Sequence, residues 1–300
     1  MTNLKEFLSL LNAQRKETAP FVSRRRYNYL LGKYNTIKET LTSVGNPLSV
    51  PPKFSWVQPH VPKFKELRLM VTYAQTPKIK SYVAWHAHAF AQQGVDVLLI
   101  VNTDHPESAA QIGTISSDFS GVCVRENKGF DFGAWSHLMR HIDSHGLDRL
   151  YWVNDSLFGP LQMGFFEKMI HTVRSSSSDV VGLTENLTDE RHLQSYFLCF
   201  NKRILNDQIF RNYIENLLNL PTKAFVIEFY EKQLTRLIET LGFRTEALFS
   251  LDGQENPEFT FNYPKALVSV GFPYVKTTLI RDGKDEGLAL EFLPEHLPID

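Results

Sequence analysis

Residues 95–103 read Val-Asp-Val-Leu-Leu-Ile-Val-Asn-Thr, and this nearly unbroken apolar run decides the fold. A strand with one face in water alternates apolar and polar residues, whereas a strand covered on both faces of a parallel sheet is apolar throughout. A helical pattern that ends at Gly94 precedes the run, and a second strand pattern at 121–127 follows it. We therefore predict a buried strand at 95–103 within a parallel sheet.

Strand and helix patterns alternate on both sides of this run. We expect strands at 67–74, 95–103, 121–127, 148–155, 179–186 and 192–205, and helices at 79–94, 132–146, 163–175, 210–220 and 224–243. Strands that alternate with helices pair in parallel through right-handed crossovers. The sequence therefore predicts an α/β fold with a Rossmann-like, mostly parallel sheet flanked by helices. The stretch 253–283 is rich in turn residues and is expected to be irregular.

Two parts of the chain differ in composition. We predict a helical N-terminal extension with a Pro-rich linker at 1–65, and the α/β domain at 66–300. The linker follows from five prolines between residues 46 and 64, which are incompatible with a helix. The basic run Arg24–Arg26 fits either a solvated helix face or a peripheral contact with anionic lipids at the inner face of the cell membrane.

The composition excludes several classes of protein. The 300 residues carry 32 Lys and Arg against 33 Asp and Glu, so a nucleic-acid-binding protein with a basic excess is not expected. Cys123 and Cys199 lie in separate apolar stretches, which predicts two reduced, buried thiols rather than a disulfide or a zinc site. The chain has neither an apolar run long enough to span a membrane nor the layout of a signal peptide, so the cytoplasm is the expected location.

Polar residues follow the predicted strands, at the edge of the sheet where ligands bind in open parallel folds. These residues are Tyr73, Thr103, Asn127, Asn154, Asp155, Ser156 and Glu185. Because a strand has to end in a turn, turn formation or helix capping explains any one of them taken alone. Two of the segments carry a more specific pattern.

The first segment, RENKGFDFGAW at 125–135, joins a predicted strand to a helix. Gly129 and Gly133 permit a tight turn and the close approach of a ligand or another backbone. Asp131 precedes the predicted helix, where it either caps the helix or accepts a hydrogen bond from a nucleoside. The segment contains neither a P-loop nor a GxGxxG pattern.

The second segment is Asn154-Asp155-Ser156, directly after the predicted strand at 148–155. A carboxylate in this position can share a Mg²⁺ or Mn²⁺ ion with a diphosphate, because both ions prefer oxygen ligands. The alternative is an Asx-turn that binds nothing.

Five motifs in order resemble the rhamnan synthesis protein F family, from about residue 67 to about residue 282. They are RENKGFDFGAW, YWVNDSLFGP, GLTEN, HLQSYFLCFNK and the C-terminal NP…GFPYVKTTLIR. That family is similar to GT-A-type glycosyltransferases that build bacterial surface polysaccharides such as rhamnans and O-antigens. The resemblance implies a GT-A-like fold, a nucleotide-diphosphate sugar donor and a lipid-linked or growing glycan acceptor. Other glycosyltransferase domains are further expected partners.

The resemblance and the strand-end rule together assign the site. The donor residues are Tyr73, Thr103, Asn127, Gly129, Asp131, Asn154, Asp155, Ser156 and Lys276, and the acceptor residues are His192, Gln194 and Tyr196. Glu231 matches the general base of an inverting single displacement, with Glu185 in reserve. The metal-binding Asp-x-Asp of related enzymes reads Asn154-Asp155-Ser156 here. Asp155 is therefore the one expected metal ligand, and dependence on Mg²⁺ or Mn²⁺ stays open.

Two other functions remain open from the sequence. The reduced Asp-x-Asp motif also fits a non-catalytic module that binds a glycan or a partner protein. A different enzyme that processes nucleotide sugars, or that releases sugar or phosphate without an acceptor, fits the same strand-end residues.

Overall fold

The computed structural model describes residues 51–187, 191–250 and 258–281. From Pro52 onward they belong to one compact unit. The predicted helices within residues 1–50 and the basic run Arg24–Arg26 lie outside the described residues. Cys123 and Cys199 are buried and free, as predicted. Within these described ranges, no helix combines the length and the apolar character that crossing a membrane requires.

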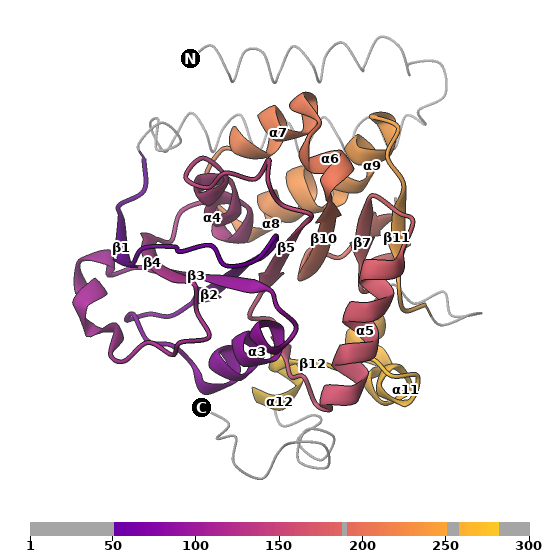
Figure 1. Cartoon of the computed structure of the whole chain (residues 1–300), viewed down its shortest axis with the longest axis horizontal. Helices are drawn as coiled ribbons and strands as arrows, with labels where there is room; N and C mark the ends of the chain where they lie inside the picture. The colour runs from indigo at the N-terminus through magenta and orange to yellow at the C-terminus, as the bar shows by residue number, and fades with distance from the viewer. Residues whose placement is uncertain (1–50, 188–190, 251–257, 282–300) are drawn as a thin grey trace. The chain divides into compact units, whose positions relative to one another are not determined.

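An eight-stranded sheet forms the centre of this unit (Figure 1), in the order β1-β4-β3-β2-β5-β10-β7-β11. The strands are β1 Phe54–Gln58, β2 Glu66–Tyr73, β3 Asp96–Thr103, β4 Gly121–Glu126, β5 Arg149–Asn154, β7 Val180–Gly182, β10 Phe197–Asn201 and β11 Thr245–Ala247. Two short ladders pair β6 Leu157–Phe158 with β12 Val275–Lys276, and β8 Glu185–Asn186 with β9 His192–Leu193.

Six of the eight strands run in one direction. β4, β3, β2 and β5 pair in parallel, and so do β7 and β11. β10 is antiparallel to both β5 and β7, so β7 runs in the same direction as β5. β1 is antiparallel to β4. The prediction of a mostly parallel sheet is confirmed.

Helices cover both faces of the sheet (Figure 1), with α3 and α5 on one face and α4, α7, α8 and α9 on the other. The helices are α3 Ser81–Gln92, α4 Phe130–Met139, α5 Met163–Ser175, α6 Lys202–Leu205, α7 Gln208–Glu215, α8 Lys223–Val226, α9 Lys232–Thr240, α10 Phe259–Asn262, α11 Pro264–Ser269 and α12 Thr277–Arg281. A 3₁₀ segment spans Pro106–Ile112, and a π-helical turn spans Ile227–Glu231.

Strand β3 shows why both faces have to be covered. All eight of its residues are buried. Val97, Leu99 and Val101 pack into one core, while Leu98 and Ile100 pack into the other. Successive side chains of a strand point to opposite faces, so an unbroken apolar run needs an apolar layer on each side. The prediction from residues 95–103 is therefore confirmed.

The Pro-rich linker predicted up to residue 65 is wrong for its last part, because β1 lies within it. Phe54–Gln58 pairs with β4, and the ring of Phe54 stacks on His141 with 5.3 Å between the ring centres. Pro52 and Pro59 flank the strand without interrupting it. Proline is tolerated beside an edge strand, where no second neighbour needs its missing N–H.

The C-terminal third contains more regular structure than predicted, and its long helix is broken. The helix predicted at 224–243 consists of α8, the π-helical turn and α9. The hydroxyl of Tyr230 binds both the N–H and the carbonyl of Leu218, at 2.8 and 3.1 Å, which anchors the π-helical turn. The stretch predicted to be irregular forms α10, α11 and α12, and α11 begins with Pro264, a favourable first residue of a helix.

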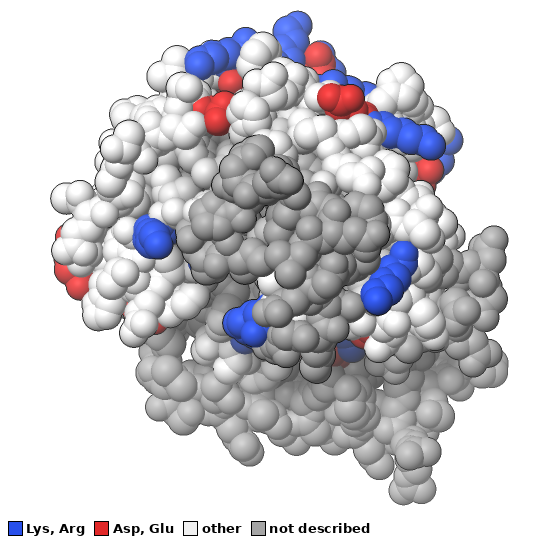
Figure 2. All heavy atoms as spheres, turned by 90° about the horizontal axis from the view of Figure 1, so that it is seen from below, with Lys and Arg blue, Asp and Glu red and all other residues white. Residues whose placement is uncertain are grey.

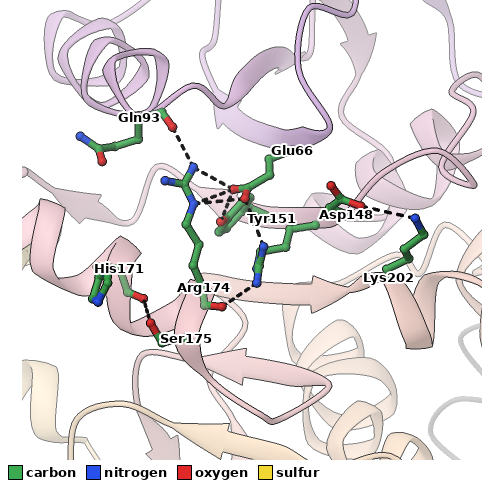
Figure 3. Close-up of polar contacts among 9 residues, drawn as sticks. Glu66, Gln93, Asp148, Tyr151, His171, Arg174, Ser175 and Lys202 are labelled. Carbon is green, nitrogen blue, oxygen red and sulfur yellow. Dashed lines mark hydrogen bonds and ion pairs between the residues drawn. The ribbon is translucent and has the colours of Figure 1, made fainter.

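One carboxylate joins the starts of β2 and β5 to helix α5 (Figure 3). Glu66 begins β2 and accepts hydrogen bonds from Arg149 at 3.2 Å, from Arg174 at 3.0 Å and from the hydroxyl of Tyr151 at 2.7 Å. Only 14% of the Glu66 side chain is exposed, so water screens these contacts less than it screens a surface ion pair.

We predict that Glu66→Gln lowers the free energy of unfolding by about 1–3 kcal/mol, because two arginines lose their carboxylate partner. Urea denaturation measures the loss. Asp148→Asn is the matched control: Asp148 pairs with Lys202 at 3.5 Å and is 44% exposed, so its loss should stay within about 0.5 kcal/mol. Equal effects of the two substitutions would contradict a special role for the Glu66 cluster.

Candidate functional site

The carboxyl ends of β2 and β5 meet at Asp155. Its Oδ2 accepts hydrogen bonds from Thr72 Oγ1 at 2.6 Å, from the N–H of Tyr73 at 3.3 Å and from Lys80 Nζ at 2.7 Å. The hydroxyl of Tyr82 donates to the main-chain carbonyl of Asp155 at 3.2 Å. These side-chain contacts all end on Oδ2, so Oδ1 is the oxygen that a ligand would meet.

This meeting point lies where the strand order reverses. From β2 the chain moves out to β3 and β4, and it then returns to β5 on the other side of β2. Crevices at such switch points are the usual binding sites of open α/β sheets. Asp155 therefore occupies the position in the fold where a ligand is most expected.

Asn154 connects Asp155 to the next strand end. Its Nδ2 donates to Asp131 Oδ2 at 2.8 Å, and its Oδ1 accepts from Ser156 N at 3.1 Å and from Ser156 Oγ at 2.6 Å. The predicted Asx-turn is therefore present at Asn154. The turn at Asn154 does not exclude a ligand at the next residue, because the carboxylate of Asp155 faces the strand ends.

Asp131 is placed by the first turn of α4, whose N-terminal cap residue is Gly129. Asp131 binds Asn154 instead of capping the helix, so the capping prediction is wrong. Its pKa is raised to about 6, chiefly by burial and also by the negative charges of Asp155 and Glu231. The hydrogen bond from Asn154 and the charge of Lys223 oppose these effects. The carboxylates of this site are therefore close enough to repel one another.

The two glycines of the same loop are explained by another part of the protein. Gly129 has φ +74°, and a Cβ there would lie 2.6 Å from the Cα of Asn219. A Cβ on Gly133 would lie 2.6 Å from Asn219 Oδ1, an oxygen that also accepts from Arg125 Nη2 at 2.7 Å. The close approach predicted from these glycines is thus made by the connection between α7 and α8.

Lys276 reaches the site through the small ladder of β6 and β12. It lies opposite Leu157, and the N–H of Thr277 binds the carbonyl of Ser156 at 2.9 Å. Its Nζ lies 4.2 Å from the ring centre of Tyr196. Burial lowers the pKa of Lys276 to about 8, although the negative charge of Glu231 acts against this.

Glu231 is the last residue of the π-helical turn, and its Oε2 accepts a hydrogen bond from Ser195 Oγ. A π-helical turn inside a longer helix is uncommon and is often found at functional sites. Glu231 also influences the pKa values of both Asp131 and Lys276. The structure therefore brings Glu231 together with Asp131, Asp155 and Lys276.

The residues predicted to bind the acceptor are mostly interior. Tyr196 and Gln194 are 3% and 7% exposed, and the side chains of both bind the hydroxyl of Thr184. His192 is 2% exposed and pairs with Asn186 in the β8–β9 ladder. Their side chains are thus directed toward the protein, and Tyr196 offers the face of its ring to Lys276.

Three further predicted residues lie in other contacts. Glu185 accepts from Arg191 Nε at 2.6 Å, in a cluster that includes Glu239. Thr103 Oγ1 donates to the carbonyl of Gln75 at 2.8 Å, and the N–H of Asn127 binds the carbonyl of Thr103 at 2.9 Å. Thr103 and Asn127 lie at the neighbouring strand ends, whereas Glu185 belongs to a separate ion-pair cluster.

Sequence reasoning predicted Lys276 but missed two other cations of the site, Lys80 and Lys223. Lys80 immediately precedes α3, seven residues beyond the end of β2, and Lys223 begins α8. The switch-point rule alone would have directed attention to the segment after β2. Seen from below, the basic side chains around the middle of this side lie apart from one another (Figure 2). Asp155 pairs with Lys80, and the charge of Lys223 acts on Asp131, so each carboxylate has a cation from a different element.

The described residues contain no cluster of three His, Cys, Asp or Glu side chains arranged to hold a metal ion. Asp155 remains the one carboxylate of the Asn154-Asp155-Ser156 segment. A divalent cation at Asp155 stays a prediction.

Comparisons with known proteins agree with the motif resemblance. The family model described as rhamnan synthesis protein F matches residues 78–296. An uncharacterized protein of Sinorhizobium fredii, y4gN, is 30% identical over 135 residues, which are 43% of this chain and 35% of that protein. Virulence protein VirA of Vibrio anguillarum is 27% identical over 177 residues, which are 55% of this chain and 54% of VirA. The chain thus spans about a third to a half of the length of these relatives.

The matched range 78–296 contains Lys80, Asp131, Asp155, Glu231 and Lys276. It covers most of the 300 residues. The chain belongs to the rhamnan synthesis protein F family, which is associated with polysaccharide synthesis.

Proposed function

We propose that this protein is a GT-A-type glycosyltransferase that moves a sugar from a nucleotide-diphosphate donor to a growing bacterial surface polysaccharide. The observation that carries the proposal is the grouping of Asp155, Asp131 and Glu231 around the sheet's switch point, in a chain that matches the family over 78–296. The acceptor is a lipid-linked or growing glycan. Because the chain spans only part of its relatives, other transferase domains are proposed partners.

The donor is proposed to lie along the ends of β2, β4 and β5. The ring of Tyr73 is 43% exposed and its hydroxyl is held by Asp104 at 2.7 Å, which supports stacking of a flat base or sugar on that ring. Asp131 is proposed to accept a hydrogen bond from the nucleoside. The diphosphate would then lie beside Asp155 and Lys276.

Glu231 is proposed as the general base. In a single displacement, the acceptor hydroxyl oxygen attacks the anomeric carbon while the bond to the diphosphate oxygen breaks. The hydroxyl proton passes to Glu231, and the nucleoside diphosphate leaves with the bonding electrons. Ser195 holds the carboxylate through its hydrogen bond, which supports a fixed orientation of the base. The acceptor would enter beside Ser195. It would lie between the donor and the stretch of chain that contains His192, Gln194 and Tyr196.

We predict that Glu231→Gln lowers turnover by at least about a hundredfold while donor affinity stays nearly unchanged, because the variant keeps the shape and loses the base. Steady-state kinetics and calorimetry measure the two quantities. The product should have the anomeric configuration opposite to that of the donor, which NMR determines.

The matched control for this test is Glu228→Gln. Glu228 lies on the same π-helical turn and pairs with Lys232 at 3.3 Å. Its variant should keep most of the turnover. Near-normal turnover in Glu231→Gln would remove Glu231 from the mechanism, and a retained configuration would exclude a single displacement.

Asp131 gives a prediction for the pH dependence of stability. Its pKa rises from 3.8 to about 6 in the folded protein, so between these values the folded state binds a proton that the unfolded chain has released. The free energy of unfolding therefore decreases as pH rises through this range. Asp131→Asn cannot ionise, so its stability relative to the wild type should increase between about pH 4 and about pH 7.

Urea denaturation at a series of pH values measures this difference. Asp143→Asn, on an exposed turn, serves as the control and should leave the shape of the pH profile unchanged. A constant difference between Asp131→Asn and wild type at all pH values would be the contrary result. The same variant should bind nucleoside diphosphates more weakly if Asp131 contacts the nucleoside.

A further inference from the structure

We propose that Lys80, held by Asp155 and assisted by Lys276, neutralises the diphosphate of the donor in place of a divalent cation. This inference rests on the proposed function. It assigns Asp155 a positioning role: the carboxylate orients an ammonium group instead of ligating a metal.

The first argument is the occupancy of Asp155. Lys80 Nζ lies 2.7 Å from Oδ2, the oxygen that also accepts from Thr72 at 2.6 Å. A divalent cation on Oδ2 would meet this ammonium at contact distance, and a cation on Oδ1 would share the carboxylate with it, so in both cases two positive charges would repel each other. The side chains of Lys80 and Asp155 are 31% and 20% exposed, so a ligand from solvent can reach the pair.

The second argument is that the neighbouring oxygens are already used. The amide oxygen of Asn154 accepts both hydrogen bonds from Ser156, and Asp131 Oδ2 accepts the amide of Asn154. Mg²⁺ demands near-octahedral oxygen coordination, and Mn²⁺ prefers similar ligands. The described part of the chain offers no group of three acidic or histidine ligands for either ion. The residues present therefore fit an ammonium better than a metal.

The third argument is that the ammonium of Lys80 has a hydrogen-bond donor left for a ligand. An ammonium carries three N–H groups. One points to Asp155, and the hydroxyl of Tyr82 lies 3.4 Å from Nζ. The backbone of Lys80 is fixed because its carbonyl accepts from the N–H groups of Val83 and Ala84 at the start of α3. A remaining N–H can thus reach a phosphate oxygen without breaking the pair with Asp155.

The fourth argument is a second lysine anchored to the same segment. The backbone of Lys276 lies opposite Leu157, and its neighbour Thr277 binds the carbonyl of Ser156. The side chain of Lys80 and the backbone of Lys276 are thus both tied to the short stretch 155–157, and the ammonium of Lys276 lies 4.2 Å from the ring centre of Tyr196. Burial lowers the pKa of Lys276 to about 8, so a bound anion would stabilise the charged form that burial disfavours. Lysine is a common ligand of phosphate groups.

The test is calorimetric binding of uridine, guanosine and thymidine diphosphates to the full chain, once with EDTA and once with added Mg²⁺ or Mn²⁺. We expect at least one of them to bind with EDTA, with a dissociation constant within about threefold of that with metal. Lys80→Met should weaken this binding at least about tenfold, and Lys80→Arg should keep most of it because the charge remains. Lys78→Met, on an exposed residue two positions away, is the matched control and should bind normally.

Asp155→Asn tests the positioning role through a double-mutant cycle. If Asp155 acts through Lys80, its effect on binding in EDTA should disappear in the Lys80→Met background. If Asp155 ligates a metal, its effect should persist in that background when Mg²⁺ or Mn²⁺ is present, and Asp155→Asn should remove any gain in affinity from these ions. Melting temperatures show whether each variant folds, and the comparison of EDTA with metal needs only the wild type.

Three outcomes would overturn the inference, and they separate it from the proposed function. Binding that requires Mg²⁺ or Mn²⁺ would overturn the role of Lys80 and leave the glycosyltransferase proposal intact. Normal binding by Lys80→Met would do the same. No binding of any of the three diphosphates, with or without metal, would overturn both.

Discussion

The parallel pairing of β2 with β5 is the constraint on which the rest of this structure depends. Its register runs from Glu66 opposite Arg149 to Val71 opposite Asn154. A carboxylate secures each end: Glu66 at the amino ends of the strands and Asp155 at their carboxyl ends. A slip of one residue would turn every side chain of a strand to the opposite face. The same pairing therefore fixes both cores and the switch point.

The site is a balanced group of charges built from separate elements. Asp131 and Asp155 follow the strands and Glu231 comes from a π-helical turn, while Lys80 and Lys276 come from opposite parts of the sequence. Burial and the neighbouring negative charges raise the pKa of Asp131, and burial lowers the pKa of Lys276. Groups with displaced pKa values that converge at the edge of a sheet are characteristic of binding and catalytic sites.

The sequence predicts those features that depend on local pattern. The unbroken apolar run at 95–103 identifies a strand buried on both faces, and the strand-end rule brings Asp131 and Asp155 to one edge. Features that depend on distant contacts escaped prediction. Gly129 and Gly133 are small because Asn219 packs on them, some ninety residues later in the chain. Strand β1 escaped because its flanking prolines suggested a linker, and only its pairing with β4 reveals it.

Charged residues also divide into those that a local pattern predicts and those that depend on distant contacts. Glu185 lies at the end of a predicted strand and Glu231 within a predicted helix, and only the structure shows that Arg191 draws Glu185 into another cluster. Lys80 carries no motif and becomes significant only because α3 begins beside Asp155. Sequence reasoning thus located the edge of the sheet where the site lies. Of the cations there, Lys276 was predicted through the family motif, whereas Lys80 and Lys223 depend on tertiary packing, which local patterns do not encode.

The docking of β12 on β6 has a consequence for how the protein is made. Lys276 is supplied by a strand that emerges from the ribosome more than a hundred residues after its partner, β6. The residues of strands β1 to β7 therefore leave the ribosome before Lys276 is added to the chain. A nascent chain thus contains these strands before it has its complete set of site charges. A chain that ends before residue 275 would therefore lack both the ammonium of Lys276 and the strand that pairs with β6.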